Sequence, residues 1–177
     1  FGMQMATIEF ARNVLSLKVA NSTEVNLKTP HPVIHIMPNQ ADYLAKKQYG
    51  GTIRLGAWPC VVKKATLLEK AYLKYGSDKK SPWWESRNSE TLKAKDGLLV
   101  YERHRHRYEF NNKYKEKFEK KGFVISGTSP DGKLVEAIEI SDHPFFVGTQ
   151  FHPEYISRPL TPHPIFAAFL EAVSAKN

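Results

Sequence analysis

The chain has only one cysteine, Cys60, and no apolar run that approaches the length of a membrane span. One cysteine cannot form an internal disulfide, which is typical of a reducing compartment, so we expect a cytoplasmic protein. Residues 1–15 do not read as a signal peptide, because Glu9, Arg12 and Asn13 interrupt the apolar positions. These features argue against a disulfide-stapled secreted protein and against a membrane partner.

Acidic residues are scarce relative to basic ones: 18 Asp and Glu stand against 26 Lys and Arg, a formal net charge of +8. Such an excess can indicate nucleic-acid binding. The basic residues are spread along the chain, however, and no nucleic-acid motif accompanies them. We therefore expect no nucleic-acid partner, and we expect the charge to attract anionic small molecules or an acidic partner surface.

The most informative segment is Gly-Thr-Gln-Phe-His-Pro-Glu at residues 148–154, which ends an apolar run predicted as a buried strand, Phe145-Phe146-Val147. His152 and Glu154 lie two residues apart. A histidine held by a carboxylate is the base half of a nucleophilic triad, because the carboxylate fixes the tautomer and stabilises the imidazolium. The spacing alone also suits a surface histidine and glutamate in a loop at the end of a strand.

Other segments favour the catalytic interpretation. Residues 50–56 read GGTIRLG, 102–109 read ERHRHRYE, and 143–159 read HPFFVGTQFHPEYISRP. With the opening FGMQMATIEFARNV, they closely resemble the glutaminase domain of the CTP synthases, which are class I glutamine amidotransferases. The resemblance covers nearly the whole chain except roughly residues 76–98. ERHRHRYE is its most specific part, because many class I amidotransferases share the His-Pro-Glu ending.

The resemblance implies where the nucleophile lies. The opening run resembles the segment that follows the cysteine in the family pattern G-x-C-x-G-M-Q, so we expect that cysteine immediately before Phe1. The chain, residues 1–177, is then expected to be the C-terminal portion of a glutaminase domain. Cys60 begins an apolar run and lacks the glycine-flanked turn of a nucleophile elbow. We predict that Cys60 is a buried small hydrophobe.

The resemblance also implies a reaction. A cysteine thiolate attacks the side-chain amide of L-glutamine, and the resulting γ-glutamyl thioester is hydrolysed to glutamate. His152 would protonate the departing ammonia and then help to activate water, while Glu154 would orient His152. The backbone N–H of Phe1 would stabilise the oxyanion.

Three residues are implied to bind the substrate. Glu24 would face the α-ammonium of glutamine, and Arg107 would grip the α-carboxylate. Gln4 matches a family glutamine that lines the same pocket. Without the resemblance, Glu24 would be interpreted as a loop acid and Arg107 as part of a basic surface strand.

The implied partners lie outside the chain. No cofactor or metal is expected in this domain. Ammonia would pass to a synthetase domain of the same polypeptide, which uses ATP and Mg to convert UTP to CTP. GTP would act as an allosteric activator, and the full-length enzyme would be a homo-oligomer, a tetramer. Two alternatives remain: the glutaminase of another class I amidotransferase such as GMP synthetase, or a non-catalytic binding or regulatory module.

The residue patterns predict an α/β fold, and the resemblance implies an open, mostly parallel sheet flanked by helices. Helices are predicted over 3–15, 66–75 and 112–121 and from His163-Pro164 onward, and strands over 31–37, 51–58, 61–65, 123–128 and 133–140. Thr66 is a candidate N-cap, and Pro-Asp-Gly at 130–132 predicts a hairpin. The predicted buried stripe of the last helix consists of Ile165, Phe166, Phe169, Leu170 and Val173.

Two further expectations concern less regular segments. Residues 77–97 are polar and predict a loop or mobile insertion, with Trp83-Trp84 as packing anchors. His104 and His106 alternate with arginines, which would repel a metal cation. Successive residues of this segment are expected on opposite faces of an extended strand, one face serving glutamine and the other a partner domain or an effector.

Overall fold

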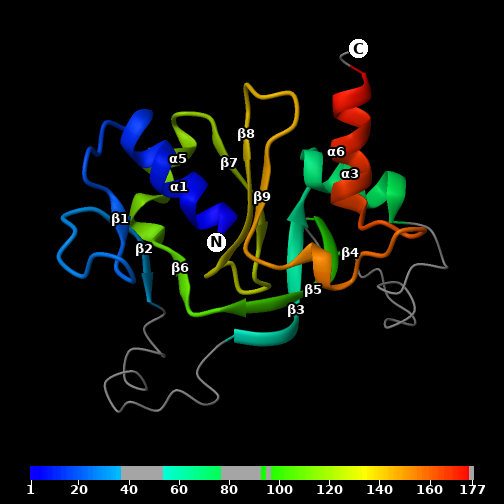
Figure 1. Cartoon of the computed structure of the whole chain (residues 1–177), viewed down its shortest axis with the longest axis horizontal. Helices are drawn as coiled ribbons and strands as arrows, with labels where there is room; N and C mark the ends of the chain where they lie inside the picture. Colours follow the sequence, from blue (N-terminus) through cyan, green and yellow to red (C-terminus); the bar gives the residue numbers. More distant parts are fainter. Residues whose placement is uncertain (37–53, 77–92, 95–96, 176–177) are drawn as a thin grey trace.

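The computed structural model describes residues 1–36, 54–76, 93–94 and 97–175 (Figure 1). The helices are α1 (Gly2–Asn13), α3 (Leu67–Tyr75), α5 (Lys115–Glu119) and α6 (Pro164–Ser174), with short 3₁₀ turns η1 (Asn112–Tyr114) and η2 (Pro153–Tyr155). The strands are β1 (Asn21–Ser22), β2 (Pro32–Ile36), β3 (Arg54–Lys63), β4 (Lys93–Ala94), β5 (Gly97–His106), β6 (Tyr108–Phe110), β7 (Phe123–Thr128), β8 (Val135–Ile140) and β9 (Val147–Thr149).

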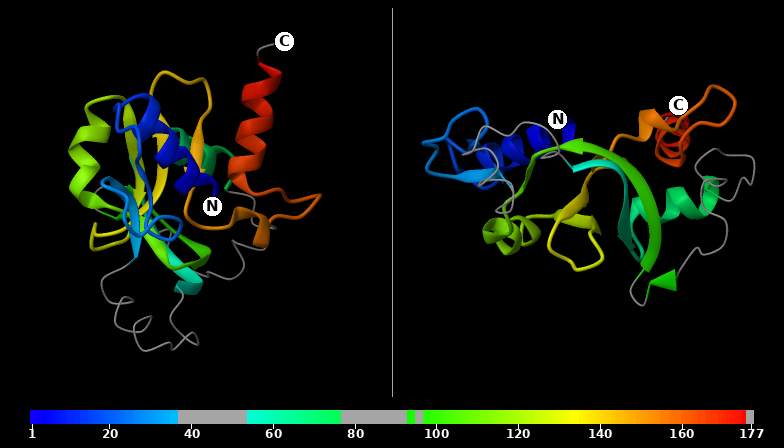
Figure 2. Two further views of the ribbon diagram at one scale, coloured as in Figure 1. Left: turned by 60° about the vertical axis from the view of Figure 1, so that its left-hand side comes forward. Right: turned by 90° about the horizontal axis from the view of Figure 1, so that it is seen from below.

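The strands form two sheets. The larger has the order β4-β5-β3-β7-β8-β9, and every pairing in it is antiparallel. In the smaller sheet, β1-β2-β6, β1 and β2 are parallel while β2 and β6 are antiparallel. Figure 2 shows the larger sheet curling, with helices at both ends of the molecule.

The prediction of a mostly parallel sheet is therefore wrong for the described part of the chain, although its α/β character is confirmed. Parallel neighbours need a crossover connection of about a dozen residues or more. Only six residues, 129–134, join β7 to β8, and another six, 141–146, join β8 to β9. Links this short turn the chain straight back, so these strands pair antiparallel.

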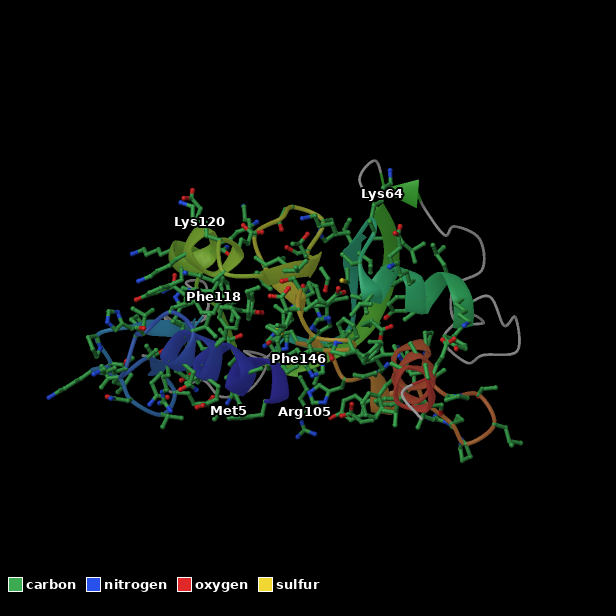
Figure 3. All side chains as sticks on the ribbon, turned by 90° about the horizontal axis from the view of Figure 1, so that it is seen from above. Met5, Lys64, Arg105, Phe118, Lys120 and Phe146 are labelled. Carbon is green, nitrogen blue, oxygen red and sulfur yellow. The ribbon has the colours of Figure 1, made fainter. Side chains whose placement is uncertain are left out.

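Two apolar clusters hold the layers together. The first contains α1, α5 and the strands between them, and four phenylalanine rings, Phe10, Phe110, Phe118 and Phe123, stack or meet edge to face within it. On α5, Phe118 is fully buried while Lys120 just beyond points outward (Figure 3). The second cluster lies under α3 and includes Cys60, which is fully buried as predicted. Burial raises the pKa of the Cys60 thiol well above its usual value, which keeps it protonated.

The predicted helix boundaries of α3 are confirmed. Thr66 is its N-cap, with the side chain accepting the Glu69 N–H, and Gly76 is its C-cap. The Glu139 carboxylate accepts both the Leu67 and Leu68 N–H groups at 2.9 Å, which places negative charge at the positive end of the helix. α3 is thereby fixed to β8.

Other local predictions had mixed outcomes. The two strand pieces predicted at 51–58 and 61–65 are one strand, β3; Pro59 is tolerated there because β7 pairs only with Val61 and Val62, leaving that edge free at position 59. The helix predicted over 112–121 is the 3₁₀ turn η1 followed by α5, which ends at Glu119. Gly122 follows shortly after with a φ of +86°, which suits glycine. Of the range 77–97, residues 77–92 and 95–96, with Trp83 and Trp84, lie outside the described residues. Lys93 and Ala94 pair with β5.

The buried stripe predicted for α6 is wrong. Ile165 is buried, but Phe166, Phe169, Leu170 and Val173 are between 36% and 62% exposed. Helical periodicity identifies residues on one face, whereas burial requires a neighbour to cover that face. α6 meets α3 through the apolar cluster that Ile165 shares with Leu68 and Tyr72. It also meets α3 through polar groups: Lys74 pairs with Glu171, and the Tyr75 hydroxyl donates to Glu171 at 2.6 Å.

Candidate active site

His152 lies just after β9, at the entrance to the 3₁₀ turn η2, and its ring is held from several sides. Nδ1 lies 2.6 Å from Glu154 Oε1, and the ring stacks on Tyr155 with centroids 4.8 Å apart. The His152 N–H donates to the Arg103 carbonyl of β5 at 2.8 Å. With Nδ1 donating to the carboxylate, Nε2 is the nitrogen left to exchange protons. The contact between His152 and Glu154 is therefore present, and their roles as base and orienter stay a prediction.

The N-terminus of α1 lies beside His152, because glycine permits a close approach between α1 and β9. A Cβ on Gly148 would lie 3.0 Å from Ile138 Cγ1 and 3.5 Å from Met3 Cα. Phe1 is the N-cap of α1, so the amide groups of the first helical turn are directed at this region. The start of α1 is therefore a ready site for developing negative charge.

A cavity of about 200 Å³ opens beside these elements. Its walls bring together segments far apart in the sequence; they consist of Phe1, Gln4, Glu24, Arg105, His106, Arg107, Tyr108, Gln150 and His152. Five of the six residues singled out from the sequence line this cavity. Glu154 lies behind His152 and lines a second cavity of about 390 Å³ that reaches Phe146 and Phe166.

Two side chains of opposite charge, Arg107 and Glu24, line the smaller cavity. Arg107 belongs to neither β5 nor β6 but lies at the bend where the chain passes from one sheet to the other. Glu24 is exposed in the turn after β1. Tyr108 lines the same cavity, and burial raises its pKa; the Glu24 carboxylate adds to the rise while Arg107 opposes it. A zwitterion would find both complementary charges here.

Gln4 lies in the cavity wall but is already engaged. It is 5% exposed, and its Nε2 donates to the Tyr108 carbonyl at 3.0 Å. Four lining residues were not predicted as site residues: Arg105, His106, Tyr108 and Gln150. The sequence did carry a signal for these four residues, namely their membership of the two motifs. Three of them lie in ERHRHRYE, and Gln150 lies in GTQFHPE.

The expected alternation along β5 is confirmed. Glu102 and His104 are buried, whereas Arg103 and Arg105 are exposed. Glu102 accepts a hydrogen bond from the Tyr72 hydroxyl at 2.7 Å and lies 3.0 Å from His163 Nε2. The inward face of β5 therefore serves a buried polar core, and the expectation that this face meets a partner domain or an effector is wrong for Glu102 and His104.

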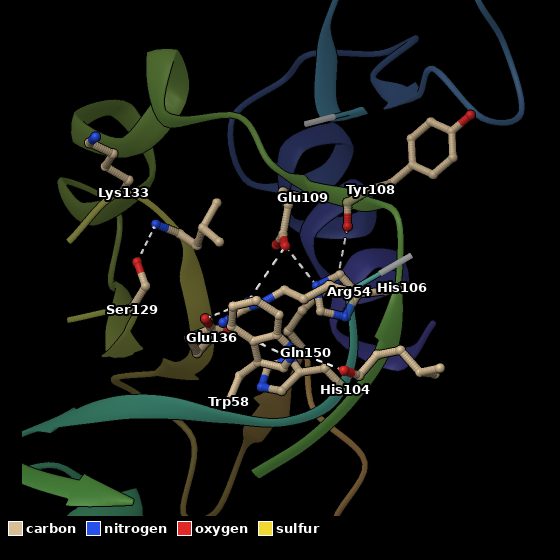
Figure 4. A network of polar contacts seen from close by, with 12 residues as sticks. Arg54, Trp58, His104, His106, Tyr108, Glu109, Ser129, Lys133, Glu136 and Gln150 are labelled. Atoms are coloured by element: carbon tan, nitrogen blue, oxygen red, sulfur yellow. Dashed lines mark hydrogen bonds and ion pairs between the residues drawn. The ribbon is translucent and has the colours of Figure 1, made fainter. Parts of the chain in front are cut away.

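A buried ionic cluster lies on the far side of this wall (Figure 4). Arg54 Nη1 is 2.5 Å from Glu136 Oε1 and 3.7 Å from Glu109 Oε1, and His106 Nε2 is 2.6 Å from Glu109 Oε1. Burial, together with the charge of Arg54, lowers the pKa of His104 to about 2, so His104 stays neutral although its Nδ1 is 3.6 Å from Glu136 Oε2. Among the described residues, no group of three or more His, Cys, Asp or Glu side chains could hold a metal ion.

Comparison with known proteins decides the family. The sequence pattern described as "Glutamine amidotransferase class-I" matches residues 1–172. The chain belongs to this family. The chain is similar to the CTP synthases of Halalkalibacterium halodurans, at 50% identity over 97% of the chain, and of Caldanaerobacter subterraneus subsp. tengcongensis, at 55% over 97%. It spans 27% of the length of each of these relatives.

A solved structure gives the same result for this amidotransferase. The chain resembles the glutaminase domain of Trypanosoma brucei CTPS with bound acivicin, with a TM-score of 0.77 and 35% identity. The match covers 99% of this chain and 58% of that one. The predicted resemblance to CTP synthase glutaminase domains is confirmed, as is the class I amidotransferase fold. In the part of the chain that the structure describes, no helix is long and apolar enough to cross a membrane.

Proposed function

We propose that this chain hydrolyses L-glutamine to glutamate and ammonia as the glutaminase part of a CTP synthase. The observation that carries the proposal is the cavity that Phe1, His152, Glu24 and Arg107 line together. It combines a general base, a helix N-terminus and two opposite charges within one space of about 200 Å³. An α-amino acid with a side-chain amide needs each of these.

The proposed nucleophile is a cysteine directly preceding Phe1 in the full-length protein. The position of Phe1 beside His152 in the cavity lining supports this assignment. The thiolate attacks the amide carbon, the C–N bond breaks, and Nε2 of His152 delivers the proton with which ammonia departs. Water then attacks the γ-glutamyl thioester, the C–S bond breaks, and glutamate leaves. His152 accepts the proton of that water, and Glu154 stabilises the imidazolium. The Phe1 N–H would donate to the oxyanion in both steps.

Substrate recognition rests on Glu24, Arg107 and Gln4. Nε of Arg107 is buried and has no hydrogen-bond partner in the described part of the chain, so the guanidinium can bind a carboxylate. Glu24 would accept from the α-ammonium. Gln4 would contribute mainly by its position in the wall, since its amide nitrogen already donates to Tyr108.

The remaining proposals concern the whole enzyme. Ammonia would pass to a synthetase region outside this chain, where ATP and Mg would support conversion of UTP to CTP, with GTP as allosteric activator. The names and greater length of the CTP synthase relatives support this assignment. We also propose that the whole enzyme is a homotetramer in the cytoplasm.

The decisive experiment replaces His152 by Ala in the full-length enzyme. We expect CTP synthesis from glutamine to be abolished and synthesis from added ammonia to persist, because only glutamine hydrolysis needs His152. His143→Ala is the matched control. His143 begins the 143–159 segment that also contains His152, but it is exposed and lines neither cavity. Loss of both activities in a folded His152→Ala protein, or retention of glutamine-dependent synthesis, would contradict the proposal.

A further inference from the structure

Two side-chain amides converge on one backbone carbonyl in the wall of the cavity. Gln4 Nε2 and Gln150 Nε2 donate to the Tyr108 carbonyl at 3.0 and 2.9 Å. Both glutamines are only 5% exposed. Figure 4 shows Tyr108 and Gln150 together with the residues of the buried ionic cluster. A carbonyl oxygen has two lone pairs, so this acceptor is fully used.

The three residues come from the three segments on which the proposed reaction depends. Gln4 is on α1, one turn from Phe1. Gln150 precedes His152 by two residues, and its own N–H donates to the Glu136 carbonyl at 2.8 Å. Tyr108 directly follows Arg107. The two bonds therefore connect the start of α1, the histidine segment and the arginine segment at one point.

Strand pairing does not hold the backbone of Arg107 in place. It lies at the bend between β5 and β6, outside the ladders of both sheets. The side-chain amides hold the adjacent residue where regular strand pairing ends. A shift of about 1 Å in a positioning element can cost a hundredfold in rate.

We propose that Gln150 is a positioning residue that fixes the Arg107 guanidinium relative to His152 through the Tyr108 carbonyl. The inference rests on the proposed glutaminase function and deepens it. Gln150 does not take part in the bond-breaking steps. Its task is to set the distance between the group that binds the substrate carboxylate and the base that acts on the amide.

The test uses Gln150→Met and Gln150→Glu in the full-length enzyme. Methionine keeps the volume but removes the donor, and loss of one such hydrogen bond should raise the KM for glutamine by about 3- to 10-fold. The kcat should change much less, because His152 and Glu154 retain their own contacts. Ammonia-dependent CTP synthesis should stay unchanged and reports correct folding.

Gln150→Glu separates positioning from general structural damage. An ionised carboxylate would face the Tyr108 carbonyl as a second acceptor, whereas a protonated one can donate to it. Burial raises a carboxyl pKa, so protonation should occur as the pH falls from about 8 to about 6. The KM ratio of Gln150→Glu to wild type should therefore fall with the pH, while the ratio for Gln150→Met stays constant.

Asn112→Leu is the matched control. It removes another bond from a side-chain amide to a backbone carbonyl, 2.6 Å to Lys133, at a site that lines neither cavity. If wild type hydrolyses glutamine but Gln150→Met keeps its KM, or the Gln150→Glu ratio does not respond to pH, the positioning role is refuted and the glutaminase function stands. If wild type does not hydrolyse glutamine, both are refuted.

Discussion

Glu136 provides a test of the buried cluster beneath the cavity, because its carboxyl titrates in an experimentally accessible range. The side chain is fully buried in β8, with Oε1 2.5 Å from Arg54 Nη1. Burial raises its pKa from 4.5 to about 7; Arg54 opposes the rise, and the neighbouring Glu109 carboxylate adds to it. The folded protein thus holds this proton more tightly than the unfolded chain does.

The size of the effect follows from the shift. A rise of about 2.5 pKa units corresponds to about 3 kcal/mol of differential stability. Because the folded-state pKa is raised, this stabilisation is fully present below about pH 4.5, the unfolded value, and is lost as the pH rises through about 7. Glu136→Gln is neutral throughout. The free energy of unfolding of Glu136→Gln, taken relative to that of wild type, should therefore rise by about 3 kcal/mol between pH 4.5 and pH 8. This change with pH does not depend on how the two proteins differ in stability at pH 4.5.

Native-state hydrogen exchange of the β7 and β8 amides measures this opening free energy within the full-length protein. Glu116→Gln is the control, because the Glu116 side chain is 89% exposed and should give a difference independent of pH. If the difference in opening free energy between Glu136→Gln and wild type also stayed constant from pH 4.5 to pH 8, the assignment of a buried, titrating carboxyl to the cluster would be refuted.

Two further predictions concern elements that position the site. Gly148→Val should push α1 away from β9, because its Cβ would already touch Met3 Cα of α1 at 3.5 Å and its two methyl groups need further room. We expect glutamine hydrolysis to fall by about tenfold or more, with ammonia-dependent synthesis preserved, and unchanged hydrolysis would contradict this packing. Thr66→Ala removes the N-cap of α3 and should lower the free energy of unfolding by about 1 kcal/mol or less, because Glu139 still accepts two N–H groups at this helix end. Thermal unfolding measures the change. A loss above about 2 kcal/mol would show that Glu139 does not compensate for the missing cap.

The sequence alone determined the features that depend on short-range chemistry. The caps of α3 at Thr66 and Gly76, the hairpin at 130–132 and the pairing of His152 with Glu154 each involve residues within a few positions of one another. The alternation of exposure along β5 follows from the two-residue repeat of any strand. The family followed from motifs, because ERHRHRYE and GTQFHPE are specific residue strings.

Only the tertiary structure decided which segments meet. The convergence of Gln4 and Gln150 on the Tyr108 carbonyl joins residues 104 and 42 positions from it, and no local pattern specifies such a contact. No local pattern specifies the antiparallel order of the larger sheet or the exposure of Phe169 and Leu170 on α6 either. Periodicity fixes which side chains share a face, but burial and hydrogen bonding depend on what the rest of the chain places opposite that face.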